Sequence, residues 1–202
     1  GATGGPLRRI QPLTQNFESG ESLAIVFSMG TVKRLNSTTG PWNNFPGFDA
    51  RVSEENKFTR RFALAHAAAQ RRQGTGIREF QVSGAGIADF IWIHHDKRGK
   101  HPPTISAFEI KLKDWKNGLR QAYRYSFFAD FSYLVVPDEL AAAVATHVSV
   151  FQEMGIGAMA FSKQNEIRLL CGQDTPGPKS MPARARALKT LRSEFNLSFF
   201  KK

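Results

Sequence analysis

Two acidic residues and one lysine in the middle of the chain have the types and spacing of a metal-dependent catalytic site. Asp89 lies within the apolar stretch 86–94, and Glu109 and Lys111 lie in the next apolar stretch, 104–112. Because the side chains of a strand alternate between its faces, Glu109 and Lys111 would share one face. Two neighbouring buried carboxylates are unfavourable through desolvation and repulsion, and a divalent cation between them removes both objections. Oxygen ligands of this kind suit Mg²⁺, with Mn²⁺ as a substitute, better than zinc.

Lys111 would stand beside such a cation without binding it. An ammonium group there can orient and acidify an attacking water, or stabilise the charge that builds on phosphorus. A cation, an activated water and a positive charge beside a phosphoryl group together describe phosphodiester hydrolysis.

Structural roles are the alternative for the same residues. A lone buried Asp89 could be satisfied by a backbone N–H or an arginine, and Glu109 with Lys111 could be an exposed ion pair. The pattern acid-x-Lys occurs three times in the chain, at 55–57, 109–111 and 114–116. Only 109–111 falls on a predicted strand that follows another strand bearing a lone acid, so the context carries the prediction of a site.

The pattern of apolar residues predicts the elements that position these side chains. Ser53 is a suitable N-cap for a first helix, with Glu54 and Glu55 in its first turn, where the helix dipole favours anions. The stretches 86–94 and 104–112 are predicted to form an antiparallel hairpin. The order of elements predicts an α/β fold with a mixed sheet flanked by helices. In chain order we expect a helix at 53–72, strands at 78–83, 86–94 and 104–112, a helix at 114–130, a strand at 131–136, a helix at 138–154, strands at 156–161 and 166–171, and a helix at 183–195.

Asp89, then Glu109-Ile110-Lys111, then a helix carrying Gln121 and Tyr125 resemble the PD-(D/E)XK nuclease superfamily. The resemblance covers residues 53–137 and implies a restriction-endonuclease-like core. It implies that Asp89 and Glu109 bind Mg²⁺ together with the backbone carbonyl of Ile110, and that Lys111 is catalytic.

The same resemblance extends to residues on the two flanking helices. Many members add a further metal ligand, a glutamate from the preceding helix, for which Glu55 fits best and Glu54 is the second choice. The spacing of Gln121 and Tyr125 resembles the extra motif of RecB-like members, which implies a catalytic role for Gln121 and a contact with the site or the nucleic acid for Tyr125. Ala88 stands where the family pattern has a proline.

The charge of the chain favours a polyanionic partner. It has 28 Lys and Arg against 17 Asp and Glu, a formal net charge of +11, which points first to nucleic acid. We expect phosphate contacts, which supply affinity but no sequence reading, from a basic turn and from the last helix. The residues predicted for them are Lys97, Arg98, Lys100, Arg184 and Arg186.

Composition also sets the expected domains and location. We expect an N-terminal extension at 1–50, partly disordered, a nuclease-like domain at 51–172, and a basic C-terminal linker and helix at 173–202. Cys171 is the only cysteine, so no disulfide framework can form within the chain. No apolar run approaches the roughly 20 residues that span a bilayer and no signal-peptide pattern is present, so we expect a cytoplasmic protein without a membrane partner.

These observations predict a Mg²⁺-dependent endonuclease that hydrolyses DNA, with RNA left open as a substrate. Junction resolvases, restriction or phage-defence enzymes and exonucleases all fit, as do a homodimer and a subunit of a larger nucleic-acid-processing complex. The alternative is a non-catalytic nucleic-acid-binding or assembly module on the same fold.

Overall fold

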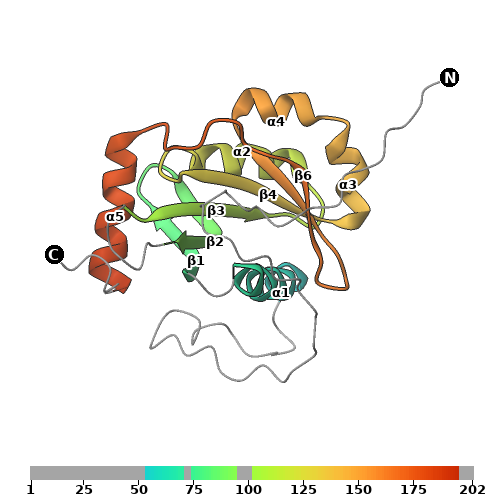
Figure 1. Ribbon diagram of the computed structural model, residues 1–202, viewed down its shortest axis with the longest axis horizontal. Helices are drawn as coiled ribbons and strands as arrows, with labels where there is room; N and C mark the ends of the chain where they lie inside the picture. Colours follow the sequence, from blue (N-terminus) through green and yellow to red (C-terminus); the bar gives the residue numbers. More distant parts are fainter. Residues whose placement is uncertain (1–52, 71–73, 95–101, 196–202) are drawn as a thin grey trace, which may run out of the picture. The chain divides into compact units, whose positions relative to one another are not determined.

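The computed structural model describes residues 53–70, 74–94 and 102–195. The predicted extension at 1–50 and the predicted phosphate-contacting residues Lys97, Arg98 and Lys100 lie outside the described residues. All described residues belong to one compact unit, Thr39–Lys202. They form an α/β fold in which a six-stranded mixed sheet is flanked by helices (Figure 1).

The sheet has its strands in chain order, from β1 to β6. Neighbouring strands are antiparallel at the start of the sheet, parallel from β3 to β5, and antiparallel again at β5 and β6. The predicted hairpin of the second and third strands is therefore confirmed, and the sheet is mixed as predicted. The strands are β1 (Thr75–Val82), β2 (Gly86–His94), β3 (Thr104–Ile110), β4 (Phe131–Pro137), β5 (Gly157–Phe161) and β6 (Ile167–Cys171).

Helix α1 (Glu54–Ala69) covers one face of the sheet, below the strands in Figure 1. The Ser53 side chain caps it by accepting a hydrogen bond from Asn56 N at 3.2 Å, as the sequence predicted. Phe58 and Phe62 pack into an aromatic cluster with residues of β2, β3, β4 and β5. This packing fixes the first turn of α1 against the sheet.

The remaining helices pack on the opposite face and at the β1 end. Helix α2 (Trp115–Tyr125) packs with α3 (Asp138–Ala145) and α4 (Val148–Met154) over β4 and β5. Helix α5 (Met181–Phe195) packs with β1, β2 and the end of α2. Figure 1 shows α1 across the sheet from α2, α3 and α4.

The prediction of one continuous helix at 138–154 is wrong, because the chain breaks between α3 and α4. The backbone N–H of His147 donates to Val144 O, three residues back, and so leaves the α-helical pattern. The side chains of Thr146 and His147 both hydrogen-bond to the carbonyl of Ala143, the group that the His147 N–H would need. Local side-chain bonding of this kind competes with helix continuation.

Candidate active site

The site lies where β2 and β3 separate. The two strands pair from His94↔Thr104 to Phe90↔Phe108, and Asp89 and Glu109 are the next residues on each side. Beyond the last pair, the Asp89 side chain takes the place of a backbone partner: its Oδ2 accepts a hydrogen bond from Ile110 N at 2.7 Å. Strand separation thus holds one carboxylate against the backbone of the neighbouring strand.

A local irregularity of β1 and β2 also orients Asp89. Ala88 and Ile91 pack in the same cluster although they are three residues apart, which a regular alternating strand does not allow. By the register of the neighbouring pairs, Asp89 faces Glu79 of β1. Glu79 has a φ of 51°, an uncommon conformation for a residue with a side chain. Conformations of this kind persist where the surroundings impose them, often at functional sites.

Glu109 is the most buried ionisable side chain of the site, with 1% exposed. Its Oε2 accepts a hydrogen bond from the Tyr125 hydroxyl at 2.6 Å. Its Oε1 lies 2.7 Å from Lys111 Nζ, but this ion pair lacks the alignment of a hydrogen bond, and Oε1 accepts none from the described residues. Glu109 therefore has one oxygen fixed by α2 and one available to a further partner.

Lys111 connects β3 to α1. Its Nζ lies 3.3 Å from Glu55 Oε1, in the first turn of α1. Its side chain passes beside Gly118 of α2, where an added Cβ would stand 2.6 Å from Lys111 Cγ, so the close approach needs a glycine. Glu54 instead is exposed and pairs with Lys57 at 2.7 Å. Of the two glutamates predicted for an accessory role, Glu55 reaches the site.

In the absence of a bound cation, the electrostatics of the site favour protonation of Asp89 and Glu109. Burial raises the pKa of Asp89 to about 7, the charge of Glu109 adds to the rise, and Ile110 N–H and Lys111 oppose it. Burial also raises the pKa of Glu109, and the Lys111 ammonium and the Tyr125 hydroxyl oppose this rise. For Lys111, burial lowers the pKa, but the carboxylates, Glu109 first, outweigh it and the net pKa is raised. The site holds more negative than positive charge, which it relieves by binding protons or another cation.

The donor set fits a hard divalent cation. Asp89 and Glu109 offer carboxylate oxygens, and the buried Glu109 Oε1 is an oxygen without a hydrogen bond that a cation would satisfy. Among the described residues, no three His, Cys, Asp or Glu side chains gather closely enough to hold a metal ion by themselves. A cation here would therefore take further oxygens from water or substrate, as Mg²⁺ commonly does.

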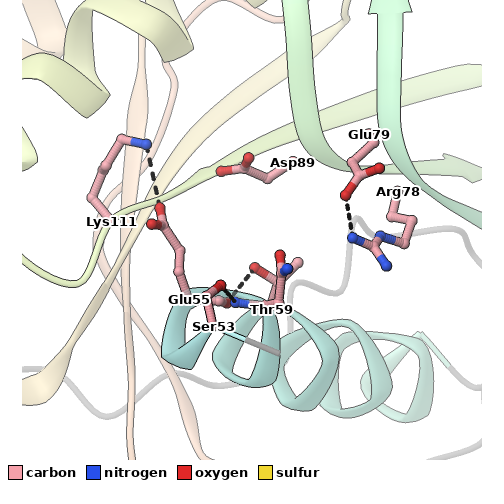
Figure 2. A pocket seen from close by; sticks show the side chains of 8 residues that line it. Ser53, Glu55, Thr59, Arg78, Glu79, Asp89 and Lys111 are labelled. Carbon is pink, nitrogen blue, oxygen red and sulfur yellow. Dashed lines mark hydrogen bonds and ion pairs between the residues drawn. The ribbon is translucent and has the colours of Figure 1, made fainter. Parts of the chain in front are cut away.

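A polar pocket of about 260 Å³ opens beside Asp89. Figure 2 shows the Asp89 carboxylate directed toward the side on which Lys111 and Glu55 lie, away from the Arg78–Glu79 ion pair. Arg78 and Glu79 were not predicted from the sequence, because nothing in a short strand marks an Arg-Glu pair as part of a site. The lining residues are Ser53, Glu55, Asn56, Thr59, Arg78, Glu79, Asp89 and Lys111.

The other residues that the family resemblance placed near the site are only partly brought together. Tyr125 is buried, and its hydroxyl bonds Glu109 and Ile87 O, so it supports the site from inside and cannot contact a nucleic acid. Ile110 contributes its N–H to Asp89, while the predicted role of its carbonyl stays a prediction. Gln121 is half-buried on α2, where its Oε1 lies 3.5 Å from Asn117 Nδ2. Its catalytic role also stays a prediction.

The prediction that Arg184 contacts nucleic acid is wrong. Its side chain is buried, and its guanidinium forms an ion pair with Asp130 at 2.8 Å. It also donates to the carbonyls of Phe128 and Pro103. Arg186, two residues on, is exposed on α5 beside Gly84, and its contact with phosphate stays a prediction.

Comparisons with known proteins assign no function to this chain. No protein-family model matches the sequence, and no curated protein matches it. A solved structure, a protein of unknown function from Silicibacter pomeroyi, aligns with a TM-score of 0.42 and 14% identity over 69% of this chain and 93% of that one. In the described part of the chain, no helix combines the length and apolar character needed to cross a bilayer.

Proposed function

We propose that this protein is a metal-dependent nuclease that hydrolyses phosphodiester bonds of DNA on a restriction-endonuclease-like, PD-(D/E)XK core. The observation that carries the proposal is the setting of Glu109. It is a buried carboxylate fixed by Tyr125 and paired with Lys111, and it lies next to the point where β2 and β3 separate and Asp89 turns toward Ile110.

The order and placement of the elements support the same proposal. Helix α1 precedes the hairpin and supplies Glu55, and α2 follows it and supplies Tyr125, one from each side of the sheet. Strand β3 is antiparallel to β2 and parallel to β4. The site residues thus come from one continuous helix–hairpin–helix segment, which is the segment in which the family resemblance was seen.

Each side chain has a separate role in this proposal. Asp89 and Glu109 would hold Mg²⁺ or Mn²⁺, which when bound supplies positive charge for the phosphoryl oxygens. Lys111 orients the attacking water or stabilises charge on the phosphate, from its place between Glu109 and Glu55. Tyr125 positions Glu109 by holding its second oxygen. Glu55 is the accessory acid that keeps Lys111 directed toward α1.

A non-catalytic nucleic-acid-binding or assembly module is the second candidate. The observation in its favour is that Lys111 already pairs with both Glu109 and Glu55. The same contacts would serve as a purely structural ion-pair network. This candidate predicts salt-dependent binding of nucleic acid with no cleavage in any divalent cation.

A cleavage panel separates the two candidates. Labelled single-stranded, duplex, branched and circular DNA and RNA would be incubated with Mg²⁺, Mn²⁺ or excess EDTA. We expect cleavage in a divalent cation that falls at least about 100-fold in Asp89→Asn, Glu109→Gln and Lys111→Met proteins. Glu55→Gln should lower the rate less, and Glu54→Gln is the matched control that should leave it unchanged.

The proposal has two clear ways to fail. Cleavage by the wild-type protein that persists in excess EDTA would exclude the metal-dependent mechanism. Binding without cleavage of any substrate in Mg²⁺ or Mn²⁺ would favour the non-catalytic module. Circular dichroism of each variant establishes that a lost activity is not a lost fold.

A further inference from the structure

The solvent-facing side of α2 is a row of positive charge. Lys113, just before α2, and Lys116, Arg120 and Arg124 on α2 are all exposed, and the four-residue spacing of the three helical residues places those three on one face. The helix Trp115–Tyr125 contains no acidic residue. Among the described residues, none of the four side chains has a partner for an ion pair or a hydrogen bond, and Lys116 only approaches the Trp115 ring at 5.8 Å.

Elsewhere in the described part of the chain, three basic residues are paired with acidic side chains. Lys57 pairs with Glu54, Lys163 with Glu139 and Arg168 with Asp138. On α2, by contrast, Lys116, Arg120 and Arg124 follow one another at intervals of four residues, where like charges repel and destabilise a helix. The row therefore does not stabilise the fold, and its charge is available to a polyanion.

An exposed aromatic ring stands at the end of this row. Phe127 follows α2 by two residues and remains 37% exposed. Its ring and the Tyr123 ring are perpendicular, with their centroids 5.7 Å apart. Tyr123 itself is covered by Lys179, whose Nζ lies 4.2 Å from the ring centroid. Phe127 is thus the ring of this pair that offers a free surface.

We propose that the exposed side of α2 binds a single-stranded segment of nucleic acid. Lys113, Lys116, Arg120 and Arg124 would contact successive phosphates, and Phe127 would stack on an unpaired base, the combination that single-strand-binding surfaces use. A duplex keeps its bases stacked inside and offers nothing to Phe127. The inference rests on the proposed function and names the form of its substrate. Tyr125, on the inner side of α2, joins this surface to Glu109.

The basic row is tested by binding in excess EDTA, where no metal-dependent cleavage occurs. Fluorescence anisotropy would compare a labelled single strand of roughly 20 nucleotides with the matched duplex. We expect Arg120→Glu/Arg124→Glu to weaken single-strand binding at least about tenfold and to reduce the salt slope by about 1.4. Lys57→Glu/Lys163→Glu, which lies outside α2 and the basic last helix, is the control with the same change in net charge, and it should stay within about threefold of wild type.

The aromatic contact needs a separate substitution. Phe127→Ala should weaken binding of the single strand by about 5-fold to 100-fold and leave binding of the duplex unchanged. Val150→Ala, which truncates another exposed apolar side chain, on α4, is the matched control and should change neither. Thermal unfolding of both variants establishes that they remain folded.

Three results would overturn the inference. The first is an equal loss of binding in the two double variants, which would indicate an effect of net charge alone. The second is tighter binding of the duplex than of the single strand, insensitive to Phe127→Ala. The third is binding of anionic phospholipid vesicles without binding of nucleic acid. Single-strand binding that depends on α2, in a protein that cleaves nothing, would sustain this inference and contradict the nuclease proposal. Cleavage by the wild type, together with unchanged single-strand binding in the α2 variants, would support the nuclease proposal and contradict this inference.

Discussion

The described part of the chain buries two groups of charged side chains, and their charges are balanced in opposite ways. The first is the ion pair of Asp130 and Arg184, between the end of α2 and α5. Its charges are equal and its polar atoms are occupied. Arg184 forms an ion pair with Asp130 and donates to two carbonyls, and Asp130 Oδ2 accepts from Ile105 N at 2.6 Å.

The second group is the candidate active site, where carboxylates outnumber cations. Glu55, Asp89 and Glu109 face one ammonium, that of Lys111. One oxygen of Glu109 is buried without a hydrogen bond, and burial raises the pKa of both Asp89 and Glu109. A polar residue of the adjoining strand, Glu79, has a positive φ.

The difference separates a structural role from a functional one. A buried pair whose hydrogen bonds are complete holds its elements together, and breaking it leaves an uncompensated charge. A buried excess of one charge costs stability, and proteins keep such arrangements where function needs them. We therefore expect substitutions in the two groups to change stability in opposite directions.

The largest effect should come from the balanced pair. Arg184→Met removes the cation and leaves Asp130 buried beside it, so we expect a loss of about 3–5 kcal/mol in the free energy of unfolding. Urea denaturation followed by circular dichroism measures it. Arg186→Met, on the exposed side of the same helix, is the control and should change stability by less than about 0.5 kcal/mol. A small effect of Arg184→Met would contradict the structural role of the Asp130–Arg184 pair.

Substitution in the acid-rich group should stabilise the metal-free protein. Asp89→Asn keeps an oxygen for Ile110 N–H and removes a carboxylate whose ionisation is unfavourable. In EDTA at pH 8 we expect a gain of about 1–3 kcal/mol, below the limit of about 4 kcal/mol set by the pKa shift. Asp130→Asn, the same change in the balanced group, should destabilise. If Asp89→Asn also destabilises, the two groups do not differ in the way proposed.

The gain from Asp89→Asn should depend on pH in a defined way. A carboxyl pKa raised from 3.8 to about 7 means that the folded protein holds the proton more tightly than the unfolded chain. The stability due to that proton is complete below pH 3.8 and is lost as pH rises toward 7. The difference between variant and wild type should therefore grow between pH 4 and 7 and level off above 7. Thermal unfolding in EDTA across this range measures it, and a pH-independent difference would contradict it.

Magnesium provides the complementary measurement. A cation that binds only the folded protein raises its stability by mass action. At millimolar Mg²⁺ and pH 8 we expect the unfolding temperature of the wild type to rise by a few degrees, about 1 kcal/mol or more. The temperature should not rise in Asp89→Asn or Glu109→Gln. An equal rise in all three proteins would place the bound cation elsewhere.

The sequence predicted the placement of side chains well where that placement depends on near neighbours in the chain. Alternation along β3 placed Glu109 and Lys111 on one side, and Ser53 and Glu55 followed from the rules for helix N-termini. The bounds of β2 were predicted as observed, because glycine begins it and its residues are apolar on both faces. These features depend on neighbours within a few residues, which a single sequence contains.

Features that depend on distant partners were not predicted. Arg184 resembles any other basic residue of a C-terminal helix until α5 packs against the end of α2, 54 positions away from Asp130 in the chain. The positive φ of Glu79 occurs where β1 and β2 depart from regular alternation, and no residue type in the sequence indicates it. The break at 146–147 arises from side-chain bonds to Ala143 O that compete with an otherwise helical pattern. The Arg184 failure reflects a contact between distant residues, whereas the break at 146–147 reflects a local competition that the pattern of apolar residues does not reveal.

The smallest expected effect concerns Tyr125, which lies between the two roles. Tyr125→Phe keeps the buried ring and removes the hydroxyl that bonds Glu109 Oε2 and Ile87 O. We expect a loss of about 0.5–1.5 kcal/mol of stability, the net value of one hydrogen bond. The pKa of Glu109 should rise further, because the Tyr125 bond lowers it.

If Tyr125 positions Glu109, cleavage in Mg²⁺ by Tyr125→Phe should fall about tenfold and recover partly at higher pH, where Glu109 ionises. Tyr123→Phe, on the same helix but outside the site, should alter neither the rate nor its pH profile. A pH profile unchanged in Tyr125→Phe would make its hydroxyl a structural group that belongs with Asp130 and Arg184.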